Sequence, residues 1–582
     1  TLVDNPNLSI FYKIDKTFKV PKTYAYIHII SDSLKTSVES FSNFRFFSEY
    51  LEYTLNTNLS EAVESGNNVS LEFDDAGLTI NISAYSDVLD KIIEIILNDL
   101  FKLQPNEYTF KEIYEASIKS IRDNKIKKPV MKNKLFFNKL VKFNTTLYSD
   151  IIDHYYKKEE TPKINNNENN NKNSTNSETE TNKNKQNKQI MQQNNSTMIY
   201  SDSEIFKSFQ KFYENFKTKL IFNVLFYGYI DTNEDISKIS KTISSFVNNH
   251  SDQALRNENK SNKSVTKKQR PIKDSSFAET IRNSVHLHRR IDDQIIYQIK
   301  NEAENEINHG ITTYYQIGPR DFQRSLSFTL IDKCIGTIFY HNLRTLQQLG
   351  YIVHAGSQLV DSILYFKVIV QGSKKTPLEV EKAINSVFLL AEEKLKKCEG
   401  EEFTSAKKSI KDILNKKDDN LKERSIKIWR EIYYNTFEFD RYKMLNQHVD
   451  NIKFEDVSQL FKSVFFNNPN RITVHQYSSN YKIEDINKNN NVNIDYDLNK
   501  NKKVLITDNL NYYVNQPYLL AFKSKRFNRK MIGNKNGAKK SKKNIDSGKK
   551  EFRKNSGGTG TIQKSHNVKK NEAKLKRRLR DK

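Results

Sequence analysis

The sequence predicts an α+β protein built from two tandem, similar domains, each a mixed β-sheet covered by helices. Three observations lead to this prediction. The same order of strands and helices occurs twice along the chain. The strands alternate apolar and polar side chains, which gives each sheet one buried face. The intervening helices have apolar stripes that can cover that face, and polar inserts with a basic tail complete the chain.

The first repeat is expected within residues 1–247. Its predicted order is strand, strand, helix, strand, strand, helix, helix and strand. Period-two alternation of apolar residues predicts strands at 69–73 and 78–82, and short apolar segments predict strands at 10–14, 24–30 and 220–227. Apolar residues at helical spacing predict the helices, at about 40–57, at 86–101 and from Glu107 onward.

The second repeat is expected within residues 291–480 and has the same order of elements. Its strands are predicted at 295–299, 311–317, 351–353, 364–370 and 471–476. Its helices are predicted at about 321–345, from Thr376 and from Glu402. Thr376-Pro377-Leu378-Glu379 is a capping box with proline at the first helical position, which is a specific start signal.

Two polar segments interrupt these repeats. Residues 158–197 are rich in Asn, Lys, Ser and Gln and have almost no side chains to bury, so we expect them to be disordered. Residues 248–290 have a similar composition and are expected to form a polar linker between the two domains.

The overall composition limits the class of protein. Hydrophobic residues make up 36% of the 582 residues, below the roughly 45–50% of ordinary domains, so part of the chain is not packed core. No run of 18 apolar residues occurs, which excludes a membrane-spanning helix. Two cysteines, Cys334 and Cys398, cannot build a disulfide framework, which favours a reducing compartment such as the cytoplasm. Because the chain begins with Thr1, we expect a piece of a longer protein.

The positive charge is concentrated at the end of the chain. Residues 521–582 contain 23 Lys or Arg and four acidic residues, which is +19 of the total net charge of +25. Such a block repels itself, so we expect a disordered basic tail. It could contact nucleic acid or another polyanion, or it could be a solvated extension without a specific partner.

One segment in the second repeat is similar to a known family. Residues 340–353, with Leu343-Arg344-Thr345 followed by Leu349-Gly350-Tyr351-Ile352-Val353, resemble a segment of the insulinase family, to which insulin-degrading enzyme and pitrilysin belong. Weaker similarities occur in the same order along the chain, at residues 18–22, Trp429, 439–441 and 506–520. The resemblance implies a clamshell protein whose two halves each contain two α+β domains. This chain resembles the C-terminal half, the third and fourth domains, with residues 481–520 as a C-terminal docking segment.

The resemblance also implies a function. In this family the N-terminal half contains the zinc motif H-x-x-E-H, and the C-terminal half closes the peptide-degrading chamber and contacts the substrate. We therefore expect the C-terminal half of a zinc metalloendopeptidase, inactive by itself. The zinc-bearing half would be supplied in the same polypeptide or by a partner chain. The alternative is a catalytically inactive family member that acts as a scaffold or binding protein.

Three residues of this segment are the candidate site. In the family, the positions of Arg344 and Tyr351 reach the substrate backbone, where a phenol can donate to a developing oxyanion and a guanidinium can hold carbonyls. Without the resemblance, Arg344 would cap helix carbonyls and Tyr351 would be a strand-core aromatic. Tyr340 matches a pocket-lining aromatic, with a helix core position as its alternative. Gly350 is expected to end the preceding helix.

The chain itself shows no metal motif. None of its 11 histidines forms H-x-x-E-H or H-E-x-x-H, and His341 and His354 lack a third ligand nearby in sequence. His286 and His288 stand beside Arg289 and Arg290 in the expected linker. We interpret these two histidines as solvated linker residues and assign no metal ligand in this chain.

Overall fold

The computed structural model describes most of the two repeats. The described residues are 1–31, 37–123, 128–142, 145–158, 196–217, 220–230, 233–261, 286–467, 470–482, 504–507 and 518–519. Most of the expected polar insert and the whole expected basic tail lie outside them. Within the described part of the chain, no helix is long and apolar enough to cross a membrane.

The first repeat forms a six-stranded mixed sheet in the order β1-β2-β8-β3-β5-β4. Only β2 and β8 run parallel, with Ile10 opposite Val224, and the other neighbours are antiparallel. The strands are β1 Val3–Asp4, β2 Leu8–Ile14, β3 Lys22–Ser31, β4 Asn68–Asp74, β5 Gly77–Tyr85 and β8 Leu220–Gly228.

The second repeat forms a sheet of matching topology, in the order β12-β13-β11-β14-β10-β15. β10 runs parallel to both β14 and β15. The pair β10 and β14 corresponds to β2 and β8, whereas the edge strands differ, because β1 is antiparallel to β2. The strands are β10 Gln294–Lys300, β11 His309–Pro319, β12 Ile352–Val360, β13 Ile363–Gly372, β14 Arg471–Tyr477 and β15 Val504–Thr507. The predicted fold class is therefore confirmed, and the internal duplication extends to the order and direction of five of the six strands in each sheet.

Helices cover one face of each sheet, as the alternation of the strands predicts. Apolar side chains of β3 and β5 pack against α1, α3, α4, α8 and α9, and those of β11 and β13 pack against the helices of the second repeat. In the first repeat the helices are α1 Val38–Asn58, α2 Ser60–Glu64, α3 Leu89–Lys102, α4 Glu107–Asp123, α5 Pro129–Val141, α6 Tyr148–Tyr155, α8 Asp202–Phe216 and α9 Asn233–Ser261. In the second they are α11 Phe322–Ile335, α12 Ile338–Tyr340, the π-helix η3 His341–Leu346, α13 Pro377–Lys397, α14 Glu401–Asn415, α15 Leu421–Tyr433, α16 Arg441–His448, the short η4 Val449–Asn451, α17 Phe454–Lys462 and the π-helix η5 Ser463–Asn467.

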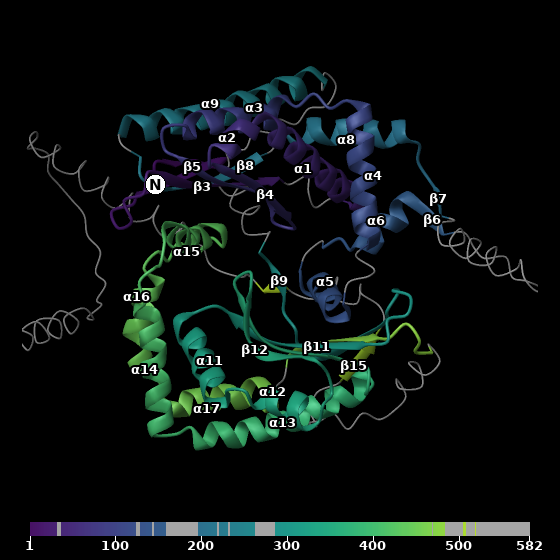
Figure 1. The fold of residues 1–582 in the computed structure, drawn as a ribbon, viewed down its shortest axis with the longest axis vertical. Coiled ribbons are helices and arrows are strands. Elements are labelled where there is room, and N and C mark those ends of the chain that lie inside the picture. The colour runs from purple at the N-terminus through teal and green to yellow at the C-terminus, as the bar shows by residue number, and fades with distance from the viewer. Residues whose placement is uncertain are drawn as a thin grey trace, which may run out of the picture. The chain divides into compact units, whose positions relative to one another are not determined.

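The other face of each sheet is partly covered by a helix from the opposite repeat. Helix α15 of the second repeat lies against β3 and β8 of the first sheet (Figure 1). In this contact Trp429 stacks on Tyr26, with ring centroids 5.1 Å apart. Helix α5 of the first repeat packs on β11 and β14, where Phe137 stacks on Tyr314 at 3.7 Å. The central strands β8 and β14 are consequently buried along their whole length, which is typical of strands covered on both faces.

Short strand pairs flank these sheets. β6 (Tyr156–Lys158) pairs with β7 (Ser196–Met198), and β9 (His288–Arg289) pairs with β16 (Tyr518–Leu519). Strand β9 therefore lies inside the segment 248–290 that was expected to be a linker, and α9 also continues past residue 247. The proposed domain boundaries stay predictions.

One local expectation about the second repeat was wrong, and one covalent link was not predicted. The helix expected at 321–345 is interrupted, because α11 ends at Gly336, whose φ of 54° is left-handed and does not continue a helix. The two cysteines are paired, since Cys334 on α11 and Cys398 at the end of α13 form a disulfide across a sequence separation of 64. The packing of α11 on α13 brings them together, and sequence spacing alone gives no sign of it.

The histidines expected in a solvated linker are buried. His288 is fully buried, and its Nε2 lies 2.7 Å from Asp361 Oδ2 while its Nδ1 lies 2.8 Å from the Tyr365 hydroxyl. Lys142 forms an ion pair with the same carboxylate at 3.2 Å, and His286 Nδ1 lies 3.8 Å from Asp361 Oδ1. These four residues, Lys142, His286, His288 and Asp361, form a buried polar cluster that joins segments of both repeats.

The environment of these groups determines their protonation. Burial alone would raise the pKa of Asp361, but the Lys142 ammonium and the two histidines hold it well below its usual range. Burial lowers the pKa of His288, against the opposing effect of Asp361. On neighbouring β3, burial together with the nearby His286 lowers the pKa of His28 to about 3. At neutral pH His28 and His288 are therefore uncharged and Asp361 is ionised.

Acid should destabilise the chain through these histidines. The unfolded state takes up a proton at His28 near the ordinary pKa of about 6.5, whereas the folded state does so only near pH 3. The free energy of unfolding should therefore fall as the pH is lowered from about 6.5 toward 3, by up to about 1.4 kcal/mol per pH unit for this residue. Urea unfolding followed by circular dichroism at a series of pH values measures this slope.

The His28→Gln variant should have a shallower slope across the same pH range. His341, which is exposed to solvent, provides the control, because His341→Gln should keep the wild-type slope. An unchanged slope in His28→Gln would show that His28 is not a source of the acid sensitivity.

Candidate functional site

The three residues predicted as a site come together at one corner of the second repeat. Tyr340 ends α12, Arg344 lies in η3, and Tyr351 immediately precedes β12. The Arg344 guanidinium lies over the Tyr340 ring, 5.3 Å from its centroid, and its Nη1 donates to the backbone oxygen of Tyr351. Leu343, between them in sequence, is fully buried and anchors η3 to the core.

All three side chains are accessible. Tyr340 is 44% exposed and Tyr351 is 47% exposed, and Arg344 is also exposed. Neither tyrosine therefore occupies the core position that was the alternative for it. Arg344 binds a strand-side carbonyl oxygen instead of capping the carbonyls of its own helix.

The turn from η3 into β12 uses a different residue in the left-handed conformation from the one predicted. The left-handed residue at the helix end is Gln348, with a φ of 51°, whereas Gly350 was expected there. Gly350 is needed for a close contact: a Cβ at this position would lie 2.1 Å from the backbone oxygen of Gln371 on β13. A Cβ at Gly372 would meet the backbone oxygen of Leu349 at the same distance. The two glycines let the turn lie directly against the end of β13.

Gln371 orients Tyr351. Its side chain is fully buried, and its Nε2 donates to the Tyr351 hydroxyl oxygen at 2.6 Å. Its backbone oxygen accepts from the Tyr351 N–H at 3.1 Å, and its Oε1 accepts from the Val130 N–H in the first turn of α5 at 3.3 Å. Because the phenol oxygen accepts from Gln371, its own proton is free to be donated outward. Sequence reasoning missed Gln371, which appears only as a polar residue at the end of a predicted strand.

The site has no metal ligands of its own. Among the described residues, no group of three or more His, Cys, Asp or Glu side chains is placed to hold a metal ion. The Lys128 Nζ lies over the Tyr351 ring, 5.8 Å from its centroid. What the corner can do chemically is donate hydrogen bonds, from Arg344 and Tyr351, to carbonyl oxygens of a bound chain.

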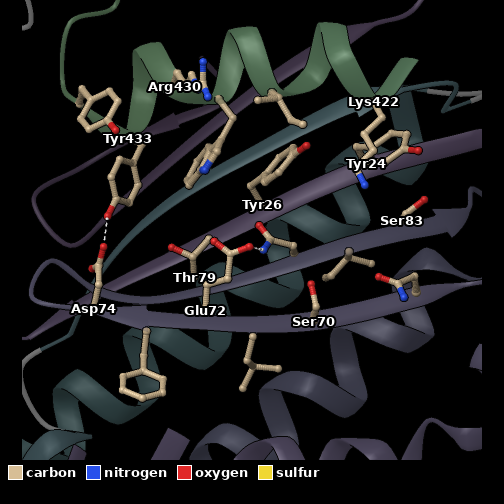
Figure 2. Close-up of a pocket in the computed structure, with 18 residues that line it drawn as sticks. Tyr24, Tyr26, Ser70, Glu72, Asp74, Thr79, Ser83, Lys422, Arg430 and Tyr433 are labelled. Carbon is tan, nitrogen blue, oxygen red and sulfur yellow. Dashed lines mark hydrogen bonds between the residues drawn. The ribbon is translucent and has the colours of Figure 1, made fainter. Parts of the chain in front are cut away.

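A second candidate surface lies on the first sheet. A cavity of about 910 Å³ opens between α15 and the outer face of β3, β5 and β4 (Figure 2). Its wall on the α15 side is aromatic, with Tyr24, Tyr26, Trp429 and Tyr433, and its floor is polar, with Ser70, Glu72, Asp74, Thr79, Asn81 and Ser83. Lys422 and Arg430 lie on α15 at its border.

Hydrogen bonds hold the charged groups of this cavity. The Tyr433 hydroxyl donates to Asp74 Oδ2 at 3.0 Å, so that α15 and the end of β4 are tied across the cavity (Figure 2). Asn81 Nδ2 donates to Glu72 Oε1 at 3.1 Å. The wall is fixed as well, because the hydroxyls of Tyr26 and Ser425 are 2.7 Å apart in the packed contact of α15 with β3. The cavity is therefore lined by residues of both repeats in defined positions.

Comparison with known families matches both repeats. Residues 1–154 match the family described as the middle or third domain of peptidase M16. Residues 330–429 match the family described as C-terminal lobe domain 4 of PQQ synthase PqqF-like proteins. The second match includes Tyr340, Arg344, Tyr351 and Gln371.

Curated relatives cover different shares of the chain. The peroxisomal insulin-degrading enzyme-like 1 of Arabidopsis thaliana is 34% identical over 135 residues, which is 23% of this chain and 14% of that protein. The insulin-degrading enzyme of Homo sapiens is 27% identical over 169 residues, or 29% of this chain and 16% of that protein. Human nardilysin is 22% identical over 445 residues, or 76% of this chain and 32% of that protein. The matched region thus spans no more than about a third of these relatives.

Solved structures share the fold. Pitrilysin superposes on 90% of this chain with a TM-score of 0.60 and 14% sequence identity, and the superposition uses 46% of pitrilysin. A protease from Helicobacter pylori superposes on 81% of this chain, using 98% of its own length, with a TM-score of 0.53 and 13% identity. At these identities the similarity establishes the fold alone.

The close contact at Gly350 can be tested by substitution. In Gly350→Ala the new Cβ would meet the Gln371 backbone oxygen, so the η3–β12 turn must move away from β13. We expect a loss of about 1–3 kcal/mol in the free energy of unfolding, as for overpacked interiors. Ser373→Ala is the control, because Ser373 is exposed directly after the end of β13 and its substitution adds no atom to the contact. Equal stability of wild type and Gly350→Ala in urea unfolding would contradict the contact.

Proposed function

We propose that this chain, as an insulinase-family protein of the peptidase M16 group, is the C-terminal half of a zinc metalloendopeptidase and contacts the peptide substrate. The relatives named insulin-degrading enzyme and nardilysin support peptide hydrolysis as the activity of the family. The described residues do not fit a zinc site, so the metal would be held by a half that is not part of this chain.

The observation that supports this proposal most directly is the convergence of Arg344, Tyr340 and Tyr351 at one exposed corner. The Tyr351 hydroxyl accepts from Gln371 and so presents its proton to a bound peptide. That proton would be donated to the carbonyl oxygen of the scissile bond as negative charge develops there.

Arg344 would hold the peptide backbone on the same corner. One of its N–H groups is used by the Tyr351 backbone oxygen, which fixes the guanidinium plane. The remaining donors can bind carbonyl oxygens of an extended peptide, since a guanidinium has five N–H donors in a fixed geometry. The Tyr340 ring, stacked on the guanidinium, would contribute apolar contact with a substrate side chain.

Two substitutions test these roles in the protein assembled with its zinc-bearing half. Tyr351→Phe removes only the hydroxyl, and we expect kcat for peptide hydrolysis to fall by on the order of 10²–10³, as for the loss of one oxyanion donor. Arg344→Gln should raise KM and lower kcat/KM, because backbone contacts to the peptide are lost. Steady-state hydrolysis of a fluorogenic peptide measures both constants.

Tyr108→Phe is the matched control, since Tyr108 on α4 is 74% exposed and far along the chain from this corner. Its kinetics should equal those of the wild type. Wild-type kcat in Tyr351→Phe, with an unchanged circular dichroism spectrum, would remove Tyr351 as an oxyanion donor. An assembled wild-type protein that binds peptide without cleaving it would favour the alternative of an inactive scaffold.

A polyanion contact through residues 521–582 is a separate part of the proposal. The 23 basic residues of this segment should release counterions on binding, so affinity for heparin should fall steeply as salt concentration rises. A chain that ends at Leu520 should lose most of this binding in a salt-gradient affinity experiment. Equal retention of the two chains would locate the contact elsewhere.

A further inference from the structure

The edge of the first sheet borders the cavity described above. β4 is the last strand in the order β1-β2-β8-β3-β5-β4, and in the part of the chain that the structure describes no strand pairs with its outer side. β4 and β5 are joined by a two-residue turn that pairs Asp74 with Gly77. By the alternation of an antiparallel ladder, the backbone groups of Val69, Leu71 and Phe73 point away from β5. This edge can therefore accept hydrogen bonds from, and donate them to, another extended chain.

The outer face of the first sheet is only partly covered by α15, and this explains why β4 and β5 are open to solvent on that face. α15 lies over β3 and β8, and one helix of about 10 Å diameter covers about two strands at their spacing of about 4.8 Å. The outer face of β5 and β4 is therefore left uncovered, and its residues are polar, as in Ser70, Asn81 and Ser83. The opposite faces of these strands carry Leu71, Phe73 and Ile80, which pack on the helices.

Glu72 and Asp74 place two negative charges along the β4 edge. They are two residues apart on β4, so both side chains point to the cavity side of the sheet, and both are exposed. Asn81 and Tyr433 each donate one hydrogen bond to them, which leaves further acceptor positions on each carboxylate. In a strand added beside β4, side chains of alternate residues would lie about 4.5–5.5 Å from those of β4 on the same face.

We propose that the β4 edge and its cavity form a second peptide-binding site, which takes an extended segment with lysine or arginine at alternate positions. The peptide pairs with the backbone of β4 as an added strand, its basic side chains face Glu72 and Asp74, and its other side chains lie on the opposite face beside Leu71 and Phe73. This site is separate from the corner at Arg344 and does not depend on the function proposed for it.

The cations of the cavity restrict where a basic side chain can lie. Lys422 and Arg430 belong to α15, at the border opposite the β4 edge (Figure 2). They disfavour basic side chains near α15 and leave the β4 side as the place for them.

The test needs only this chain and a synthetic peptide, without the zinc-bearing half. A capped peptide of alternating lysine and valine with a dansyl label is titrated with the chain, and affinity is measured from fluorescence anisotropy. Trp429 is the only tryptophan of the chain and lines the cavity, so energy transfer from it to the dansyl group reports binding near this site. We expect both signals to saturate together, and Glu72→Gln and Asp74→Asn each to weaken binding about two- to fivefold.

Matched probes separate the parts of the proposal. Glu393→Gln removes one exposed carboxylate from α13 and should leave the affinity unchanged. A peptide with glutamate in place of lysine should bind much more weakly. N-methylation of the alternate amides that pair with β4 should abolish binding. N-methylation of the intervening amides, which point away from β4, should have little effect.

Three results would overturn the proposal. They are equal binding of the lysine and glutamate peptides, equal binding of both N-methylated peptides, or binding without energy transfer from Trp429. Self-association of the chain through β4 that the peptide does not reverse would assign this edge to a second copy instead. Because no step uses the zinc-bearing half, an inactive Tyr351→Phe variant or an inactive assembly does not affect this outcome.

Discussion

Each sheet of this protein depends on a helix contributed by the other repeat. Strands β8 and β14 are buried along their whole length, so each sheet has a second face to bury in addition to the face covered by its own helices. α15 covers that face in the first sheet and α5 covers it in the second. Burial at about 25 cal/mol per Å² of apolar area makes this exchange a large favourable contribution, and it is available only when both repeats are present.

Both candidate surfaces follow from this exchange. The N-terminal turn of α5 donates to Gln371, and Gln371 orients Tyr351, so a helix from the first repeat supports the corner of the second. α15 forms the wall of the cavity on the first sheet while leaving β4 uncovered. A change in the packing of α5 would therefore alter the corner at Tyr351 in the second repeat. A change in the packing of α15 would alter the cavity on the first sheet.

Much of the fold could be predicted because its signals are local. Short apolar segments, some of them alternating, located five of the six strands of each sheet and missed β1 and β15. The capping box at Thr376 and Glu379 located the start of α13 to the residue. The convergence of Arg344 and Tyr351 follows from a short helix-to-strand connection, which a fourteen-residue segment is enough to define. The interruption at Gly336 was missed because a single glycine is weaker evidence than the apolar periodicity on either side of it.

The remaining errors concern contacts between segments far apart in the chain. His288 is polar and follows a polar segment, and only the approach of Asp361 and Tyr365 makes its burial favourable. The pairing of Cys334 with Cys398 and the partners of Gln371 likewise depend on tertiary packing, for which one sequence provides no signal.

The disulfide has a topological consequence for the corner it encloses. Cys334 and Cys398 close a covalent ring that contains η3, β12 and β13, and with them Arg344, Tyr351 and Gln371. A single backbone cut anywhere inside this ring leaves the two fragments joined until the bridge is reduced. The corner with Arg344 and Tyr351 would thus stay attached to the core of the second repeat after one accidental nick.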